Sequence, residues 1–182
     1  KAQGKWVLSL DADEALSPGL IEEIKQIIFS AAVSSEAYAI KRVSFFSGKK
    51  IRYGDWSADK VVRLFRRLAT IRFTPSMVHE HLIGYQRLAT LKQVIFHNTR
   101  KDMSQVLMKL ESYSSYGAQL AYQQHKKSSL LKAIGHSFWC FIRGYLLRLG
   151  FLDGREGFIL AISNALGVFY RYVKLIYLYE LG

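Results

Sequence analysis

The chain has 182 residues, of which 50% are hydrophobic and 14% aromatic, so it can bury the core of one domain with an appendage and is not intrinsically disordered. The net charge of +12 indicates an anionic partner, such as nucleic acid, a phosphorylated substrate or anionic lipid. The single cysteine, Cys140, excludes an intrachain disulfide and fits a reducing, cytoplasmic setting.

Residues 6–14 read Trp-Val-Leu-Ser-Leu-Asp-Ala-Asp-Glu, an apolar run followed by three carboxylates. We predict a short buried strand at 6–10, because its residues are aromatic, β-branched or apolar. Ligands of open α/β sheets bind at the carboxyl ends of strands, where Asp11 and Asp13 fall. If the chain is extended there, both carboxylates point to one side and would share a cation such as Mg²⁺ or Mn²⁺. The alternative is a solvated turn before a helix.

The predicted strand at 6–10 comes almost directly after the first residue, Lys1. A strand in a parallel α/β sheet needs neighbouring strands, and these would have to precede it in the sequence. We therefore expect that further N-terminal strands of the same sheet lie upstream of this segment.

The elements that follow indicate a mixed sheet with an antiparallel extension. Ser17 as N-cap and Pro18 at the first helical position predict a helix over 18–32. Strands are predicted at 38–46, 51–53, 60–66 and 91–96. His97 comes directly after the last of these and marks its end. Because these strands are close together in the chain without intervening helices, they depart from a βαβ order.

After residue 102 the pattern becomes helical, apolar, aromatic and basic. A helix is predicted at 103–121, and further apolar segments at 130–152 and 158–181 flank a turn at 150–157. The longest uncharged run near the end, 157–170, would span roughly 20 Å as a helix, less than the ~30 Å hydrocarbon core. We predict two amphipathic helices in the membrane interface, with packing on each other and on the main domain as the alternative.

The segment Val78-His79-Glu80-His81 and the strand-end His97 are further candidates for chemistry. His79 and His81 do not have the i, i+4 spacing of a helical metalloprotease site, so a zinc hydrolase is the less favoured function. Each residue alone also fits a structural role, since a loop glutamate is commonly solvated and a strand-end histidine commonly hydrogen-bonded.

Four motifs in order resemble glycosyltransferase family 2: residues 6–14, Val-Val-Arg-Leu-Phe-Arg-Arg at 61–67, Val-His-Glu-His at 78–81 and the strand ending in His97. With Gly-Phe-Leu-Asp-Gly-Arg-Glu-Gly-Phe at 150–158, they resemble more narrowly the bacterial lipopolysaccharide inner-core β-glucosyltransferases that act on heptose. The resemblance implies an α/β mixed sheet of the nucleotide-diphospho-sugar transferase (GT-A) type. It would comprise the catalytic domain at 1–102, without its N-terminal strands, and an α-helical, membrane-surface region at 103–182.

The resemblance also implies roles for individual residues. Asp11, Asp13 and His97 would bind a divalent metal, Mg²⁺ or Mn²⁺, beside the donor diphosphate, and Glu80 would be the catalytic base. The predicted substrate-binding residues are Trp56, Asp59, Arg63, Arg66 and His79. As an alternative, the arginines could simply form a solvated strand edge. Trp56 could instead be a half-buried residue that anchors its loop. Ala58 stands where relatives often have proline, a minor change in the stiffness of this loop.

The expected function is a metal-dependent, inverting transfer of a hexose, glucose by the resemblance, from a nucleotide sugar to a lipopolysaccharide core heptose or similar lipid-linked acceptor. The protein would lie peripherally at the cytoplasmic face of the bacterial inner membrane, with no nucleic-acid partner. Activity is expected of the complete protein, because the strands that hold the nucleotide base lie upstream. The alternatives are a basic nucleic-acid-binding module and a non-catalytic membrane-surface scaffold.

Overall fold

The computed structural model describes residues 2–30, 33–57, 59–74, 81–100 and 103–181. The chain divides into two compact units. Lys1–Ser44 and Ala58–Asn98 form the first, here called the sheet unit, and Phe45–Ser57 with Thr99–Gly182 form the second, the helical unit. The sequence pattern did not indicate that residues 45–57 join the helices.

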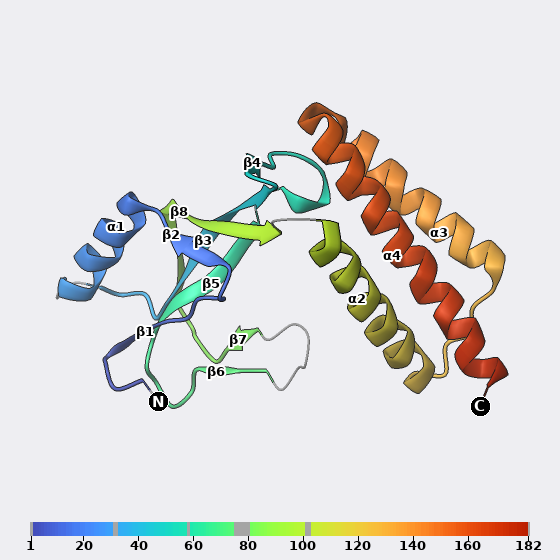
Figure 1. The fold of residues 1–182 in the computed structure, drawn as a ribbon. Helices are drawn as coiled ribbons and strands as arrows, with labels where there is room; N and C mark the ends of the chain where they lie inside the picture. The colour runs from blue at the N-terminus through green and yellow to red at the C-terminus, as the bar shows by residue number, and fades with distance from the viewer. Residues whose placement is uncertain (1, 31–32, 58, 75–80, 101–102, 182) are drawn as a thin grey trace. The chain divides into compact units, whose positions relative to one another are not determined.

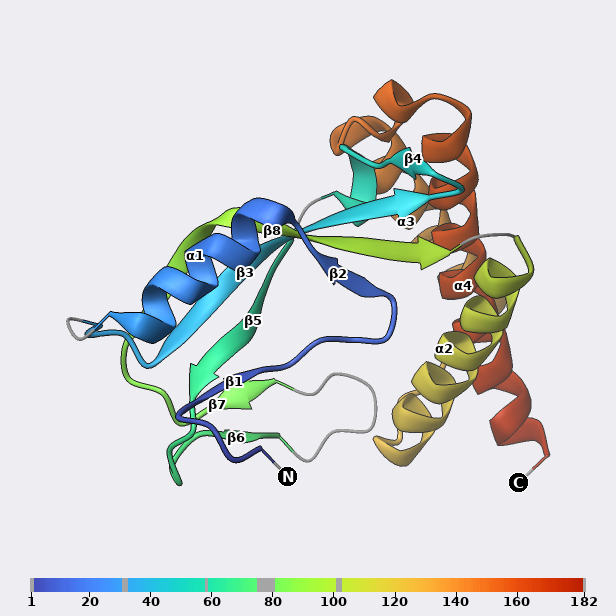
Figure 2. The same cartoon turned by 60° about the vertical axis from the view of Figure 1, so that its left-hand side comes forward.

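The main sheet is mixed, as predicted, and its strand order is β1-β5-β3-β8-β2 with β4 attached to β3. The strands are β1 (Trp6–Leu8), β2 (Glu14–Leu16), β3 (Ala37–Phe46), β4 (Lys49–Lys50), β5 (Asp59–Arg66) and β8 (Leu88–Arg100). β1 is antiparallel to β5, β5 to β3, and β2 to β8. β3 and β8 run in the same direction (Figure 2). The expected parallel setting of the first strand is wrong, because β1 pairs with an antiparallel neighbour and ends at Leu8.

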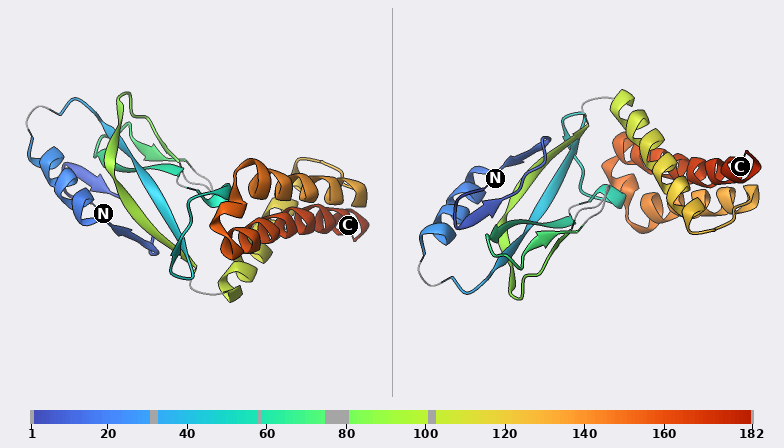
Figure 3. Two further views of the ribbon diagram at one scale, coloured as in Figure 1. Left: turned by 90° about the horizontal axis from the view of Figure 1, so that it is seen from above. Right: turned by 90° about the horizontal axis from the view of Figure 1, so that it is seen from below.

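Helix α1 (Pro18–Phe29) covers one face of this sheet, and the hairpin of β6 (Arg72–Phe73) and β7 (Leu82–Ile83) lies on the other (Figure 3). The predicted N-cap is confirmed, since the Ser17 hydroxyl accepts a hydrogen bond from the backbone N–H of Leu20 at 3.2 Å. The helix ends at Phe29 instead of residue 32, because Ser30 already has an extended backbone.

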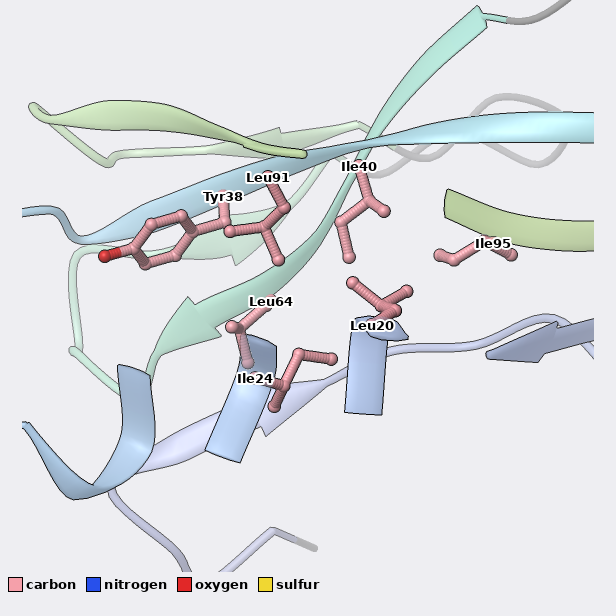
Figure 4. Close-up of a cluster of buried hydrophobic side chains, with 7 residues drawn as sticks. All are labelled: Leu20, Ile24, Tyr38, Ile40, Leu64, Leu91 and Ile95. Carbon is pink, nitrogen blue, oxygen red and sulfur yellow. The ribbon is translucent and has the colours of Figure 1, made fainter. Parts of the chain in front are cut away.

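The core between α1 and the sheet is a single apolar cluster (Figure 4). It consists of Leu20, Ile24, Tyr38, Ile40, Leu64, Leu91 and Ile95. Phe65, next to Leu64 in β5, points to the opposite face, where it packs with Ile71 and Leu82. Complete burial of one such aliphatic side chain stabilises the fold by about 1.5–3 kcal/mol, so this alternation fixes the sheet between its two covers.

Two predicted strand ends differ from the structure. Ser47 and Gly48 both have left-handed backbones, with φ values of 49° and 79°, which makes a two-residue hairpin turn. The return strand therefore starts at Lys49, and the prediction of a strand at 51–53 is wrong. The prediction that a strand ends at His97 is also wrong, because β8 continues to Arg100 and pairs His97 with Glu14 of β2.

The helical unit contains α2 (Met103–Gln123), α3 (Leu130–Ile142) and α4 (Arg155–Glu180), and α4 packs against both others (Figure 1). The C-terminal helices are therefore confirmed. The apolar segment 130–152 is helical only as far as Ile142 and continues as a π-helical turn at Arg143–Leu147 and a 3₁₀ turn at Gly150–Asp153.

The glycine-rich motif at 150–158 anchors the hairpin tip to α4. The buried Asp153 carboxylate accepts hydrogen bonds from the backbone N–H groups of Arg52 and Tyr53 at 3.0 and 2.8 Å. Gly157 is required here, because a Cβ atom at this position would lie 1.9 Å from the carbonyl oxygen of Gly150. The motif therefore serves the fold of the helical unit.

We expect Glu156→Gln to lower the free energy of unfolding at pH 7 by at most about 1 kcal/mol, because the Lys49–Glu156 ion pair of 2.8 Å is partly exposed. The hydrogen bond from Lys49 lowers the pKa of Glu156 to about 2. A depressed folded-state pKa stabilises the protein above the unfolded pKa of about 4.3, and this stabilisation is lost as the pH falls through the folded value.

The measurement is urea unfolding of both proteins between pH 7 and pH 2, with Glu180→Gln at the end of α4 as the control. The difference between wild type and Glu156→Gln should shrink below about pH 4. A constant difference over this range would contradict the assignment.

Within the described residues one helix, α4, is long and apolar enough by length and composition alone to cross a membrane. Its most apolar window has a mean hydropathy of 1.3, and 28% of that window is buried. The continuous helix is longer than the uncharged run of 157–170, because it includes charged residues at both ends and along its length.

Candidate functional site

The acidic motif forms a turn between β1 and β2. The backbone N–H of Glu14 donates to the carbonyl oxygen of Asp11 at 3.0 Å, so the chain is not extended at Asp11–Asp13. The two aspartates therefore contact different partners. Asp11 pairs with Arg63, and the Oδ2 atom of Asp13 lies 3.3 Å from Nε2 of His97.

Glu14 lies at the centre of this site, and its side chain is fully buried. Its carboxylate accepts hydrogen bonds from Nη2 of Arg63 at 2.7 Å and from the backbone N–H of Asp11 at 3.1 Å. Nη1 of Arg42 lies 3.6 Å from the same carboxylate. A buried carboxylate needs such partners to stay ionised, and here it joins β2, β3 and β5.

Arg42 links this carboxylate to a further one. Its Nε and Nη2 atoms donate to the two Asp59 oxygens at 3.0 and 2.7 Å, a bidentate pair between opposed residues of β3 and β5. Burial lowers the pKa of the Arg42 guanidinium, but the hydrogen bonds and charge of Asp59, with Glu14 and Asp11, raise it by more. Arg42 therefore stays positively charged.

We call these residues the carboxylate–arginine cluster: Asp11, Asp13, Glu14, Arg42, Asp59, Arg63 and His97. Within this cluster Arg42 and Arg63 both face Glu14, and each also pairs with a second carboxylate, Asp59 and Asp11 respectively. The Asp13 side chain is 36% exposed and His97 is buried. The Asp13 carboxylate is therefore partly accessible from solvent, and metal binding there stays a prediction.

The predicted metal ligands are brought together only in part. No three His, Cys, Asp or Glu side chains in the part of the chain that the structure describes are placed to hold a metal ion. Asp13 and His97 lie together, while Asp11 is held by Arg63. Mg²⁺ commonly binds through one or two carboxylates and takes its other ligands from water and substrate phosphates. The Asp13–His97 pair fits a cation bound in that way.

Glu80 and His79 fall outside the described residues, so their roles stay predictions. Arg66 donates to the carbonyl oxygen of Val33 at 2.7 Å, and its guanidinium carbon lies 5.3 Å from the ring centroid of Trp6.

Trp56 belongs to the helical unit, and its indole N–H donates to Oδ1 of Asn164 at 3.3 Å. It therefore has the contacts of a loop anchor, and its role toward a substrate stays a prediction. Asp59 and Arg63 are engaged inside the carboxylate–arginine cluster, where their roles toward a substrate are likewise untested predictions.

Sequence reasoning missed Glu14 and Arg42 as parts of the site. Glu14 was visible as the third acid of the motif, and its position before a short strand was the only available signal. Arg42 gave none, because it lies inside a long apolar strand and reaches Asp59 and Glu14 only through cross-strand pairing.

No family model matches the chain. In an alignment of 179 positions that covers 93% of the chain, it is 29% identical to an uncharacterized glycosyltransferase of Rickettsia prowazekii (strain Madrid E). Over the same share of the chain it is 28% identical to uncharacterized glycosyltransferases of Rickettsia typhi and Rickettsia conorii. The chain spans 61% of the first two relatives and 64% of the third. Nearly the whole chain is thus similar to a segment of each relative, and that segment makes up about three fifths of the relative's length. These relatives are named as uncharacterized glycosyltransferases.

Proposed function

We propose that the chain is part of a metal-dependent, inverting glycosyltransferase that moves a hexose from a nucleotide sugar to a lipid-linked acceptor. The observation that carries this proposal is the Asp13–His97 pair, 3.3 Å apart, which brings two of the predicted metal ligands together at a partly exposed carboxylate. The names of the relatives support sugar transfer in general. A divalent cation held by Asp13 and His97 would supply a Lewis acid for the departing diphosphate.

The residues of the chain would divide the remaining work. In an inverting transfer the acceptor oxygen forms a bond to the anomeric carbon as the bond to the diphosphate oxygen breaks. Glu80 is proposed to take the proton of the acceptor hydroxyl. The backbone N–H of Asn98 donates to the Asp13 carbonyl at 2.9 Å, and the pairing of Glu14 with His97 keeps the two strands in register. Asp13 and His97 are therefore positioned by the sheet itself.

The experiment is metal removal from the complete protein. Chelation should abolish transfer of radiolabelled sugar from a nucleotide sugar, and added Mg²⁺ or Mn²⁺ should restore it. As a readout independent of activity, Mn²⁺ affinity measured by electron paramagnetic resonance should fall at least tenfold in His97→Gln. His136→Gln, in the helical unit, is the matched control and should keep the affinity of the wild type. Full transfer after complete chelation would overturn the metal-dependent mechanism.

We also propose that the protein is peripheral at the cytoplasmic face of the bacterial inner membrane, with a lipopolysaccharide core heptose as acceptor and glucose as the hexose. The acceptor and the hexose rest on the motif resemblance alone, and the location is supported by an apolar surface on the helical unit, where Leu131, Phe138 and Leu147 are 83%, 66% and 63% exposed. A groove of about 420 Å³ between α3 and α4 continues it, lined by residues such as Ile134 and Leu166.

Exposed apolar side chains on a basic protein are typical of helices that lie in the interface of an anionic membrane. Sedimentation with anionic vesicles tests this location, and a protein that stays in the supernatant would count against it. Resistance to alkaline extraction would instead indicate that α4 spans the bilayer.

A further inference from the structure

A charged cavity lies entirely within the helical unit, and its lining includes none of the residues of the carboxylate–arginine cluster. Its volume is about 500 Å³, and Arg143, Arg148 and Arg171 line it together with Asp55 and Trp56. Asp55 is the one carboxylate among its lining residues, so three guanidinium groups leave two positive charges uncompensated. Concave surfaces with excess charge of one sign concentrate ligands of the opposite sign.

The backbone brings two of these arginines together by an unusual turn. Arg143–Leu147 is π-helical, and the backbone N–H of Arg148 donates to the carbonyl oxygen of Arg143 at 2.9 Å. In an α-helix, residues five apart point about 140° away from each other. Here both reach Asp55, with Nη2 of Arg143 at 3.3 Å and Nη1 of Arg148 at 2.5 Å. The π-helix is rare, and its single turns are frequently found at functional sites.

The residue after this turn is also strained. Leu149 has φ 58° and ψ 27°, a left-handed conformation that is unfavourable for a bulky side chain. The chain turns here from α3 into α4, and this turn places the side chains of Arg143 and Arg148 on the same carboxylate.

The hydrogen-bonding capacity of the arginines is not exhausted by Asp55. Nε of Arg143 is buried and has no hydrogen-bond partner among the residues that the structure describes. The side chains of Arg143 and Arg148 are 43% and 52% exposed, so their outer nitrogens remain accessible. Arg171 enters from α4 and adds a third planar donor. Guanidinium groups bind phosphate oxygens in pairs of hydrogen bonds, which suits a polyanionic group.

We propose that this cavity binds a phosphate or diphosphate group, through Arg143, Arg148 and Arg171, as part of a lipid headgroup or a soluble phosphorylated sugar. The inference rests on the helical unit alone and does not require the proposed transfer reaction. Solvated surface arginines are the alternative, and they would show no saturable, position-dependent binding.

The test is titration calorimetry of the 182-residue chain with pyrophosphate at low ionic strength, because salt screens exposed charges. Arg148→Gln and Arg171→Gln should each weaken binding about tenfold. Arg171→Gln leaves both ion pairs to Asp55 in place, so it separates binding from folding. Arg155→Gln is the control with the same change of charge, since Arg155 is 83% exposed and does not line the cavity.

A second arm identifies the source of the phosphate. Vesicles of phosphatidylcholine with phosphatidic acid should bind wild type more tightly than Arg171→Gln if the group belongs to a lipid headgroup. Equal vesicle binding by the two proteins, with pyrophosphate binding still reduced in Arg171→Gln, would indicate a soluble phosphate. The proposed site would be refuted if neither pyrophosphate nor the vesicles bound saturably. It would also be refuted if Arg155→Gln weakened binding as much as Arg171→Gln.

Discussion

Replacing Glu14 with alanine is expected to lower the free energy of unfolding of the sheet unit by about 3–5 kcal/mol. The Glu14 side chain is fully buried, and the side chains of Arg63 and Arg42 are only 13% and 23% exposed. Removing the carboxylate takes away the only fully buried partner of Arg63 and Arg42 among the described ion pairs. It leaves these arginines with the half-exposed Asp11 and Asp59. Such a loss costs far more than the loss of an exposed ion pair.

Hydrogen exchange of the β2 and β8 amides, followed by urea unfolding, measures this effect in the sheet unit. The matched control is Glu22→Ala, because Glu22 is 66% exposed and pairs with Lys25 on the surface of α1. Glu22→Ala is expected to lower the free energy of unfolding by less than about 0.5 kcal/mol. Similar losses for the two variants would show that Glu14 is not a central support of the site.

Glu80→Gln and Asp13→Asn are expected to lower the turnover rate of sugar transfer by the complete protein about 10²–10⁴-fold. Glutamine cannot accept the proton of the acceptor hydroxyl, and asparagine removes one of the charges that would hold the cation. The Asp13 side chain is 36% exposed, so the protein should fold normally without its charge. The measurement is steady-state transfer from the nucleotide sugar, with folding checked by circular dichroism.

Glu22→Gln on α1 controls for a general loss of acidic charge and should keep the rate of the wild type. A rate loss in Asp13→Asn that excess Mn²⁺ partly recovers would place the defect at the cation. Near-normal rates in both Glu80→Gln and Asp13→Asn would refute the proposed mechanism.

The strands and helices themselves were largely predictable from local patterns. The Ser17–Pro18 helix start and the apolar strand before Arg66 follow from capping and from side-chain alternation. The short strand β2 was not predictable, because Glu14–Leu16 lies between an acidic turn and a helix start and has no periodicity of its own. It forms because β8 offers an edge to pair with, over Ile95–His97.

The site was predictable as a set of residues and not as a geometry. Asp13 and His97 lie far apart in the sequence, and the antiparallel register of β2 and β8 brings them together. Asp11 diverges because the chain turns after β1, an outcome that the tripeptide alone does not determine. The roles of Glu14 and Arg42 depend on burial and cross-strand pairing, both of which arise only in the folded sheet.

The assignment of residues 45–57 to the helical unit means that the chain passes between the two units three times, after Ser44, Ser57 and Asn98. A single cut after Asn98 therefore leaves the sheet unit on one piece but separates residues 45–57 from the helices. The order of synthesis is affected as well, because Tyr53 precedes its partner Asp153 by 100 residues. At about 5–20 residues per second, the ribosome takes roughly 5–20 s to deliver that partner. The sheet unit must therefore tolerate 45–57 as an unpaired insertion while the helices are still being made.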